Sequence, residues 1–239
     1  MSNGDQYKQL SQRGTFTSKP VEYGRSVLGA PLFYFPAQSH SPETGLIIAG
    51  THGDETASIA LLSSALRSIE YSKLSHHLIL SVNPDGNQLG VRSNANGVDL
   101  NRNFPANNWD PSGTVYRWNS NCPERNVRLS SGHCKASEPE TQALIKLIEH
   151  LSPKFVISFH EPLACIDSID KLGLGERLSD LFQLPLVANV GYETPGSFGT
   201  WCEQICLPNV TLELPAISVD DVTQQYLDAA IQLLTQSRF

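Results

Sequence analysis

The sequence predicts a single-domain, three-layer α/β/α fold with a central mixed, largely parallel β-sheet. Short, continuously apolar runs alternate with longer segments whose apolar residues recur at helical spacing, which is typical of layered α/β proteins. A chain of 239 residues is long enough to bury one large core of this kind. Nothing in the sequence resembles a linker, so we expect residues 1–239 to form one domain.

The N-terminal elements follow from local patterns. Residues 21–36 alternate around two glycines and predict a β-hairpin. Residues 45–50 form a short apolar run, as expected of a strand buried on both faces. Segment 54–69 carries apolar side chains on one helical face and predicts a helix. Residues 78–82 predict the next strand, and the Asn-Pro-Asp-Gly sequence at 83–86 predicts a turn after it.

Regular patterns are absent between residues 86 and 137, a segment rich in Asn, Gly, Ser, Pro and Arg. A loop of this length inside a compact domain is usually functional or disordered. The aromatic residues Trp109, Tyr116 and Trp118 favour the functional interpretation. Two roles stay open for residues 105–135, a cap over a cleft or a subunit contact in a homodimer.

Regular elements resume after this loop. The sequence Ser137-Glu138-Pro139-Glu140 has the pattern of a capping box and predicts the start of a helix. The elements expected after it are a buried strand over 154–160, a helix over 175–182, a Gly/Pro-rich loop over 191–199, a strand over 209–215 and a final helix from 218.

Composition argues against several classes of protein. The formal net charge is −7, with no run of Lys and Arg, so we expect neither nucleic acid nor an anionic membrane as a partner. No run of about 18 apolar residues predicts a membrane span, and the polar start lacks a secretory signal. The odd count of 5 cysteines predicts reduced thiols in the cytoplasm, although Cys202 and Cys206 could share a helix face.

Imidazole and carboxylate groups gather where predicted strands end. His52 and Glu55 follow one apolar strand, and His160 closes another. Ligands of open α/β sheets bind at the carboxyl ends of strands, so these groups can meet in one crevice. Two His and one Glu form a known ligand set for catalytic zinc. An H-x-x-E pair alone is a weak signal, and a lone strand-end histidine usually bonds to backbone.

Two further carboxylates carry more than one interpretation. Glu213 lies between two leucines, where burial would raise its pKa and suit a general base beside a metal. The alternative is an outward-facing Glu in contact with solvent. Asp99 could orient His52 or His160 by accepting the second ring N–H of a ligand histidine.

Three loop residues have the chemistry to recognise a peptide. Asn101 and Arg102 are adjacent and can present an amide and a guanidinium fork to one carboxylate. Arg92 could polarise a scissile carbonyl. Arginines in loops are usually solvated, so these residues indicate a peptide-binding site only when they are considered together with the other motifs.

In combination, the motifs resemble the zinc carboxypeptidase family over most of the chain. The motifs, in the family's order, are the hairpin 23–32, His52-Gly53-Asp54-Glu55, Asn83-Pro84-Asp85-Gly86, Gly97 to Phe104, His160 and Glu213. The resemblance implies a zinc carboxypeptidase-like catalytic domain with one Zn²⁺ per chain. It assigns zinc ligation to His52, Glu55 and His160, catalysis to Glu213 and Arg92, carboxylate binding to Asn101 and Arg102, and ligand orientation to Asp99.

Within the family, residues 190–202 and Glu213-Leu214-Pro215 resemble bacterial members that act on murein peptides. This implies cleavage of the γ-D-glutamyl–meso-diaminopimelate bond of L-Ala-γ-D-Glu-meso-diaminopimelate during cell-wall recycling. Tyr192 is the nearest candidate for the family's mobile, substrate-binding tyrosine. Digestive members carry Arg where this chain has Asp54, so that contact is lost or replaced.

Other functions remain open at the level of sequence. A zinc deacylase of the aspartoacylase or succinylglutamate desuccinylase type shares H-x-x-E, the distal His, the Asn-Arg pair and the late Glu. A non-catalytic metal- or peptide-binding module on the same fold is a different class, which the presence of Glu213 disfavours. An acidic substrate would need local positive charge in this negative chain, and Arg117, Arg125 or Arg128 could add to it.

Overall fold

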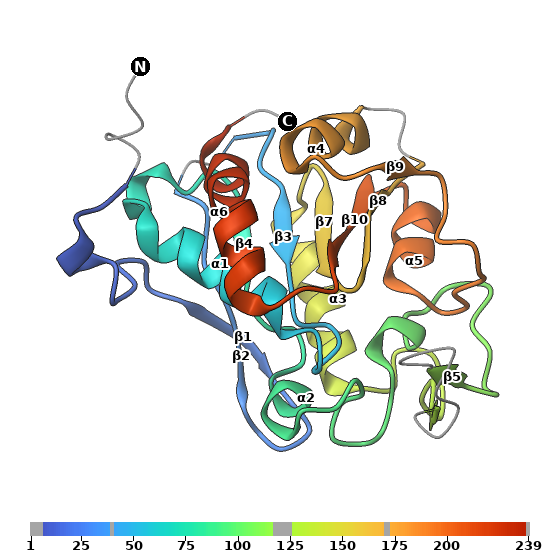
Figure 1. Ribbon diagram of the computed structural model, residues 1–239. Helices are drawn as coiled ribbons and strands as arrows, with labels where there is room; N and C mark the ends of the chain where they lie inside the picture. The colour runs from blue at the N-terminus through green and yellow to red at the C-terminus, as the bar shows by residue number, and fades with distance from the viewer. Residues whose placement is uncertain (1–6, 39–40, 117–125, 170–172, 238–239) are drawn as a thin grey trace.

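A six-stranded mixed sheet forms the centre of the molecule (Figure 1). The computed structural model describes residues 7–38, 41–116, 126–169 and 173–237. In spatial order the strands are β4 (His77–Ile79), β3 (Leu46–Ile48), β7 (Val156–His160), β10 (Asn209–Pro215), β8 (Leu163–Asp167) and β9 (Leu186–Val187). The first four are parallel to one another, whereas β8 is antiparallel to β10. This confirms the predicted mixed, largely parallel sheet.

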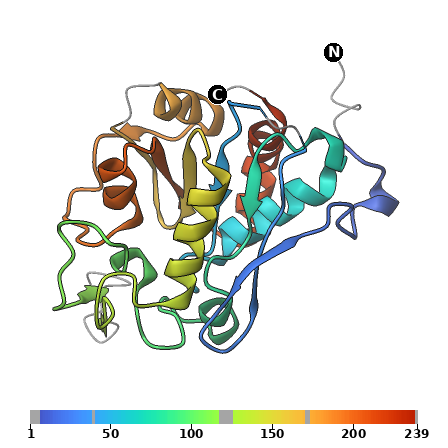
Figure 2. The same cartoon turned by 180° about the vertical axis from the view of Figure 1, so that it is seen from behind.

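Helices cover both faces of the sheet (Figures 1 and 2). One face packs against α1 (Thr56–Ser68), α4 (Leu174–Phe182) and α6 (Val219–Thr235), which share one buried apolar cluster. The opposite face packs against α3 (Pro139–Leu151) and α5 (Phe198–Gln204), which share a second cluster. Because each helix buries one apolar stripe against the sheet, the result is the predicted three-layer fold.

Smaller elements lie around this framework. A hairpin pairs β1 (Val21–Arg25) with β2 (Pro31–Tyr34), as predicted. A second pairs β5 (Thr114–Tyr116) with β6 (Val127–Leu129). The short helical turns are η2 (Leu10–Gln12), η3 (Tyr71–Lys73) and η4 (Leu100–Arg102). Among the described residues, no helix combines the length and the apolar character needed to cross a membrane.

Two local predictions were wrong in detail. Residues 83–86 open the helix α2 (Pro84–Leu89) instead of forming a simple turn. Asn83 caps this helix by accepting the N–H of Gly86 at 2.9 Å, since Asn before Pro also suits a helix start. The capping box does not form at α3, because Ser137 donates to the side chain of Glu138 instead.

Several short elements escaped prediction. Strands β8 and β9 and the helix α5 are too short to show a clear period, and β5 and β6 interrupt the segment interpreted as a loop. Cys202 is buried in α5, whereas Cys206 lies beyond its end with φ 58°, so the two do not share a helix face. The described cysteines are free thiols.

A buried histidine beside β4 predicts how stability depends on pH. Burial lowers the pKa of His76 from 6.5 to about 4, while its Nδ1 accepts the N–H of Gly45 at 3.0 Å. Below pH 6.5 the unfolded chain therefore binds a proton that the folded chain excludes, and stability falls as the pH decreases towards 4. We expect a loss of about 3 kcal/mol from this group.

Urea unfolding of the metal-free protein between pH 7 and pH 4.5 checks this expectation. His76→Asn keeps an acceptor for Gly45 and cannot be protonated, so its free energy of unfolding should vary less with pH. Parallel pH curves for the variant and the wild type would contradict the assignment.

Candidate active site

A cleft of about 820 Å³ opens at the carboxyl ends of the parallel strands. Every site residue predicted from the sequence lines it. These residues are His52, Glu55, Arg92, Asp99, Asn101, Arg102, His160, Tyr192 and Glu213. They come from the loop after β3, from the segment between α2 and η4, from η4 itself, from the ends of β7 and β10, and from the loop before α5. The tertiary fold therefore gathers groups that are distant in sequence.

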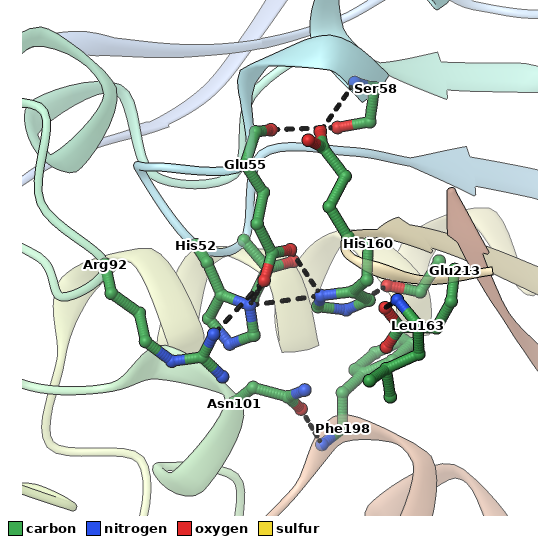
Figure 3. Close-up of polar contacts among 12 residues, drawn as sticks. His52, Glu55, Ser58, Arg92, Asn101, His160, Leu163, Phe198 and Glu213 are labelled. Carbon is green, nitrogen blue, oxygen red and sulfur yellow. Dashed lines mark hydrogen bonds and ion pairs between the residues drawn. The ribbon is translucent and has the colours of Figure 1, made fainter. Parts of the chain in front are cut away.

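Three of these side chains point toward one another (Figure 3). The carboxylate of Glu55 lies 2.6 Å from Nδ1 of His52 and 2.9 Å from Nδ1 of His160. The two Nδ1 atoms are 3.1 Å apart. All three residues are buried, so this is a closely packed set of imidazole and carboxylate acceptors.

The contacts of the two Nε2 atoms set the orientation of both imidazole rings. Nε2 of His52 lies 3.3 Å from Oδ1 of Asp99, and Nε2 of His160 lies 3.0 Å from Oγ of Ser158. An Nε2 proton facing an oxygen leaves Nδ1 as a lone-pair donor. Two such nitrogens and one carboxylate fit the ligand set of a catalytic zinc ion. Asp99 thus lies beside His52, not His160.

Close backbone packing explains the glycine between the first two of these residues. A Cβ on Gly53 would lie 2.1 Å from the carbonyl carbon of Gly86 and 2.2 Å from the oxygen of Val91. The N–H of Gly53 also donates to the carbonyl of Arg92. The turn that carries His52 and Glu55 therefore packs directly on α2 and on the segment after it, at Val91 and Arg92.

Glu213 is buried on β10, directly beside His160 of the parallel strand β7. This excludes the solvent-facing alternative. Burial raises its pKa to about 7, and the charge of Glu55 adds to the rise, whereas His160 opposes it. Its Oε2 accepts the N–H of Leu163 at 3.4 Å. A carboxyl group with a pKa near neutrality is suited to proton transfer.

Arg92 bridges two carboxylates at the edge of the cleft. Its Nη1 donates to Glu55 and its Nε donates to Asp99, each at 3.1 Å. Although burial alone would raise the pKa of both carboxyl groups, their charged neighbours hold each pKa below its ordinary value. Arg92 also lies 4.3 Å from the ring centre of Tyr116, a cation–π contact.

Asn101 and Arg102 sit on η4, held against the loop before α5. The Oδ1 of Asn101 accepts the N–H of Phe198 at 2.9 Å, which leaves its amide nitrogen to donate elsewhere. Arg102 is 7% exposed, and its Nε has no hydrogen-bond partner among the described residues. Gly196 has φ +72° and approaches Arg102 so closely that a Cβ would lie 2.4 Å from its carbonyl oxygen.

The other residues discussed from the sequence differ in whether they line the cleft. Tyr192 stands at the rim and is 58% exposed. Asp54 is half-buried and is not among the residues that line the cleft. Arg128 is exposed on β6 and also does not line it, whereas Arg117 and Arg125 lie outside the described residues.

Three residues at the cleft received no specific role from the sequence, although Tyr116 was among the aromatic residues that favoured a functional loop. Tyr116 lies over Arg92, so residues 114–116 of the long segment form part of the cleft wall. Ser158 contacts His160 from two positions earlier on the same strand face, which strand alternation could have revealed. Glu161 contacts the start of α1, and no local pattern indicates that.

Comparison with known proteins agrees with this geometry. The family model described as zinc carboxypeptidase matches residues 6–162. Murein peptide amidase A of Escherichia coli (strain K12) is 56% identical over 224 residues, covering 94% of this chain and 93% of that protein. Murein peptide amidase A of Vibrio campbellii is 58% identical, covering 94% of this chain and 90% of that protein.

Solved structures give the same result. The crystal structure of murein-tripeptide amidase from Escherichia coli O157 superposes with a TM-score of 0.93 at 55% identity, covering 96% of this chain and 97% of that one. Thrombin-activatable fibrinolysis inhibitor, at 18% identity and a TM-score of 0.69, shares the fold. From the matching family model, these relatives and the His-Glu-His cluster, the chain belongs to the zinc carboxypeptidase family and is a metallopeptidase.

Proposed function

We propose that this enzyme hydrolyses the γ-D-glutamyl–meso-diaminopimelate bond of murein peptides in the cytoplasm, during cell-wall recycling. The convergence of His52, Glu55 and His160 next to the buried Glu213 carries the proposal. High identity to proteins named murein peptide amidase A supports the choice of substrate. In this proposal residues 1–239 act as one catalytic domain with one Zn²⁺, whose ligands are the two histidines and Glu55.

Recognition of the substrate falls to Arg102 and Asn101. A buried guanidinium without a complete set of partners is costly, and a peptide carboxylate would complete it. The free amide nitrogen of Asn101 can donate to the same carboxylate. Tyr192 at the rim would contact the peptide from the open side. The result would be a local positive site inside a chain with net charge −7.

Catalysis would depend on Glu213. When bound, zinc lowers the pKa of a water molecule and polarises the scissile carbonyl. Glu213 would accept a proton from the attacking water and deliver it to the leaving amine, a task for which its raised pKa is suited. Arg92 would stabilise the developing oxyanion, and Asp99 holds both Arg92 and His52 in place.

A substrate panel tests the proposal directly. Purified protein of measured zinc content is incubated with L-Ala-γ-D-Glu-meso-diaminopimelate, with the same peptide carrying Lys, and with N-acyl amino acids. We expect the diaminopimelate peptide to be cleaved with the highest kcat/KM, because in this proposal the enzyme selects for the second carboxylate on the diaminopimelate side chain. Separation of the products by chromatography identifies the bond that is cleaved.

The other outcomes are informative. Equal kcat/KM for the Lys and diaminopimelate peptides would contradict selection for the second carboxylate. Faster cleavage of N-acyl amino acids would favour a deacylase of the aspartoacylase or succinylglutamate desuccinylase type. Zinc binding without hydrolysis of any of these compounds would indicate the non-catalytic module.

A further inference from the structure

The helix α1, which follows the turn with His52 and Glu55, has no cap from the side chain at its own N-cap position. Glu55 occupies the N-cap position of α1 but makes no capping hydrogen bond, because its carboxylate faces His52 and His160 instead. The first amides of a helix have no partner within the helix and need an acceptor. A side chain that served as the cap would turn away from the cation, so Glu55 cannot perform both tasks.

The acceptor comes from the opposite side of the site. Oε1 of Glu161 accepts the N–H of Ser58, in the first turn of α1, at 3.0 Å, one of the contacts drawn at Ser58 in Figure 3. The N–H of Ala57 contributes a second hydrogen bond to the same carboxylate. Ser58 is fully buried, so water does not compete for its amide. A negative carboxylate at a helix N-terminus is also favoured by the helix dipole.

Glu161 directly follows His160 at the end of β7. Its side chain therefore joins the strand that ends in one predicted ligand to the helix that begins after another, across 103 residues of sequence. Ser58 adds a local contact, since its Oγ donates to the carbonyl of Glu55 at 3.0 Å. The contacts run continuously from His160 through Glu161 and Ser58 to Glu55.

We infer that Glu161 is a positioning residue of the metal site, which caps α1 in place of Glu55 and thereby holds Glu55 and His160 at the spacing that one cation requires. This inference rests on the zinc site of the proposed function. Residues that orient metal ligands from outside typically change metal affinity about 10–100-fold when they are replaced. A carboxylate that merely capped a helix would change stability and leave the affinity for zinc unaltered.

Zinc affinity and the visible spectrum of the Co²⁺-substituted protein test this role. The dissociation constant for zinc is measured by competition with a chromophoric chelator for the wild type, Glu161→Gln and Glu161→Ala. We expect Glu161→Ala to raise the dissociation constant about tenfold or more and to alter the Co²⁺ spectrum. Glu161→Gln keeps an oxygen acceptor for Ser58, so its dissociation constant should rise less.

The chain offers a matched control on the neighbouring helix. Ser218 caps α6 by accepting the N–H of Asp221 at 3.1 Å, and α6 packs on the same face of the sheet as α1. Ser218→Ala removes a cap at a residue that does not line the cleft. It should lower the thermal midpoint of the metal-free protein, as Glu161→Ala does, without changing the dissociation constant for zinc.

The possible failures are separable. An unchanged dissociation constant in Glu161→Ala, or an equal rise in Ser218→Ala, would overturn this inference and leave the proposed function intact. A wild-type protein that binds no zinc would overturn the proposed function itself. If Glu161→Ala does not fold, Glu161→Asp replaces it in the same comparison, because its carboxylate is one methylene too short to cap α1.

Discussion

Glu213→Gln is expected to reduce kcat about 10³-fold while the protein keeps its zinc. The amide has nearly the shape of the carboxylate and can still accept the N–H of Leu163, so the cleft should stay intact. The amide cannot accept a proton from water, however. The variant therefore lacks the proton acceptor that Glu213 provides, whose pKa burial raises to about 7. Steady-state kinetics and zinc analysis of the same preparation measure the two quantities.

Glu149→Gln is the control for this substitution. Glu149 is exposed near the end of α3, so the variant makes the same change of charge away from the cleft. Its kcat should equal that of the wild type. Near-normal turnover by Glu213→Gln would remove Glu213 from the chemistry, and loss of zinc from that variant would show a role in metal binding instead.

His160→Ala is expected to abolish hydrolysis by removing zinc. Two ligands would remain, and His160 supplies one of the two Nδ1 atoms of the cluster. Loss of a direct ligand should weaken zinc binding by more than the ~10–100-fold typical of residues that only orient ligands. Because bound zinc stabilises the folded state, added zinc should no longer raise the thermal midpoint of the variant.

His150→Ala is the control for this substitution, because it removes a histidine that does not line the cleft. His150 is exposed beside Glu149, and its removal should leave zinc content and the zinc-dependent rise in thermal midpoint unchanged. Stoichiometric zinc in purified His160→Ala, with wild-type affinity, would show that the cation is held elsewhere.

Most of the architecture, and the residues that line the cleft as candidates for the site, could be predicted from the sequence. Residues 45–50, which include β3, form a continuous apolar run, and the helices α1, α3 and α6 carry their apolar stripes at regular spacing, so the local apolar pattern is enough to predict these elements. The strands β7 and β10 were also predicted, although each contains polar residues. The candidate site residues next to them were identified because parallel strands end at one edge of the sheet. His52, Glu55, His160 and Glu213 each lie at or just beyond such an end.

The contacts between these residues depended on the tertiary structure. For Glu213, alternation along the strand gave no preference between solvent and cleft. In the fold, β10 lies between β7 and β8 and the side chain of Glu213 is buried at the cleft. Tyr116 over Arg92 and Glu161 at the start of α1 are likewise contacts across long stretches of sequence, set by how loops close over the sheet.

By itself, the sequence determined which candidate groups this protein has for binding a cation and a carboxylate and on which kinds of element they lie, because residue type and apolar periodicity are local properties. Only the tertiary structure decided that Asp99 pairs with His52, that Glu213 is buried beside His160, and that Glu161 replaces the missing cap of α1. Those outcomes depend on the packing of segments separated by many residues, where burial and distance set the pKa and the partner of each group.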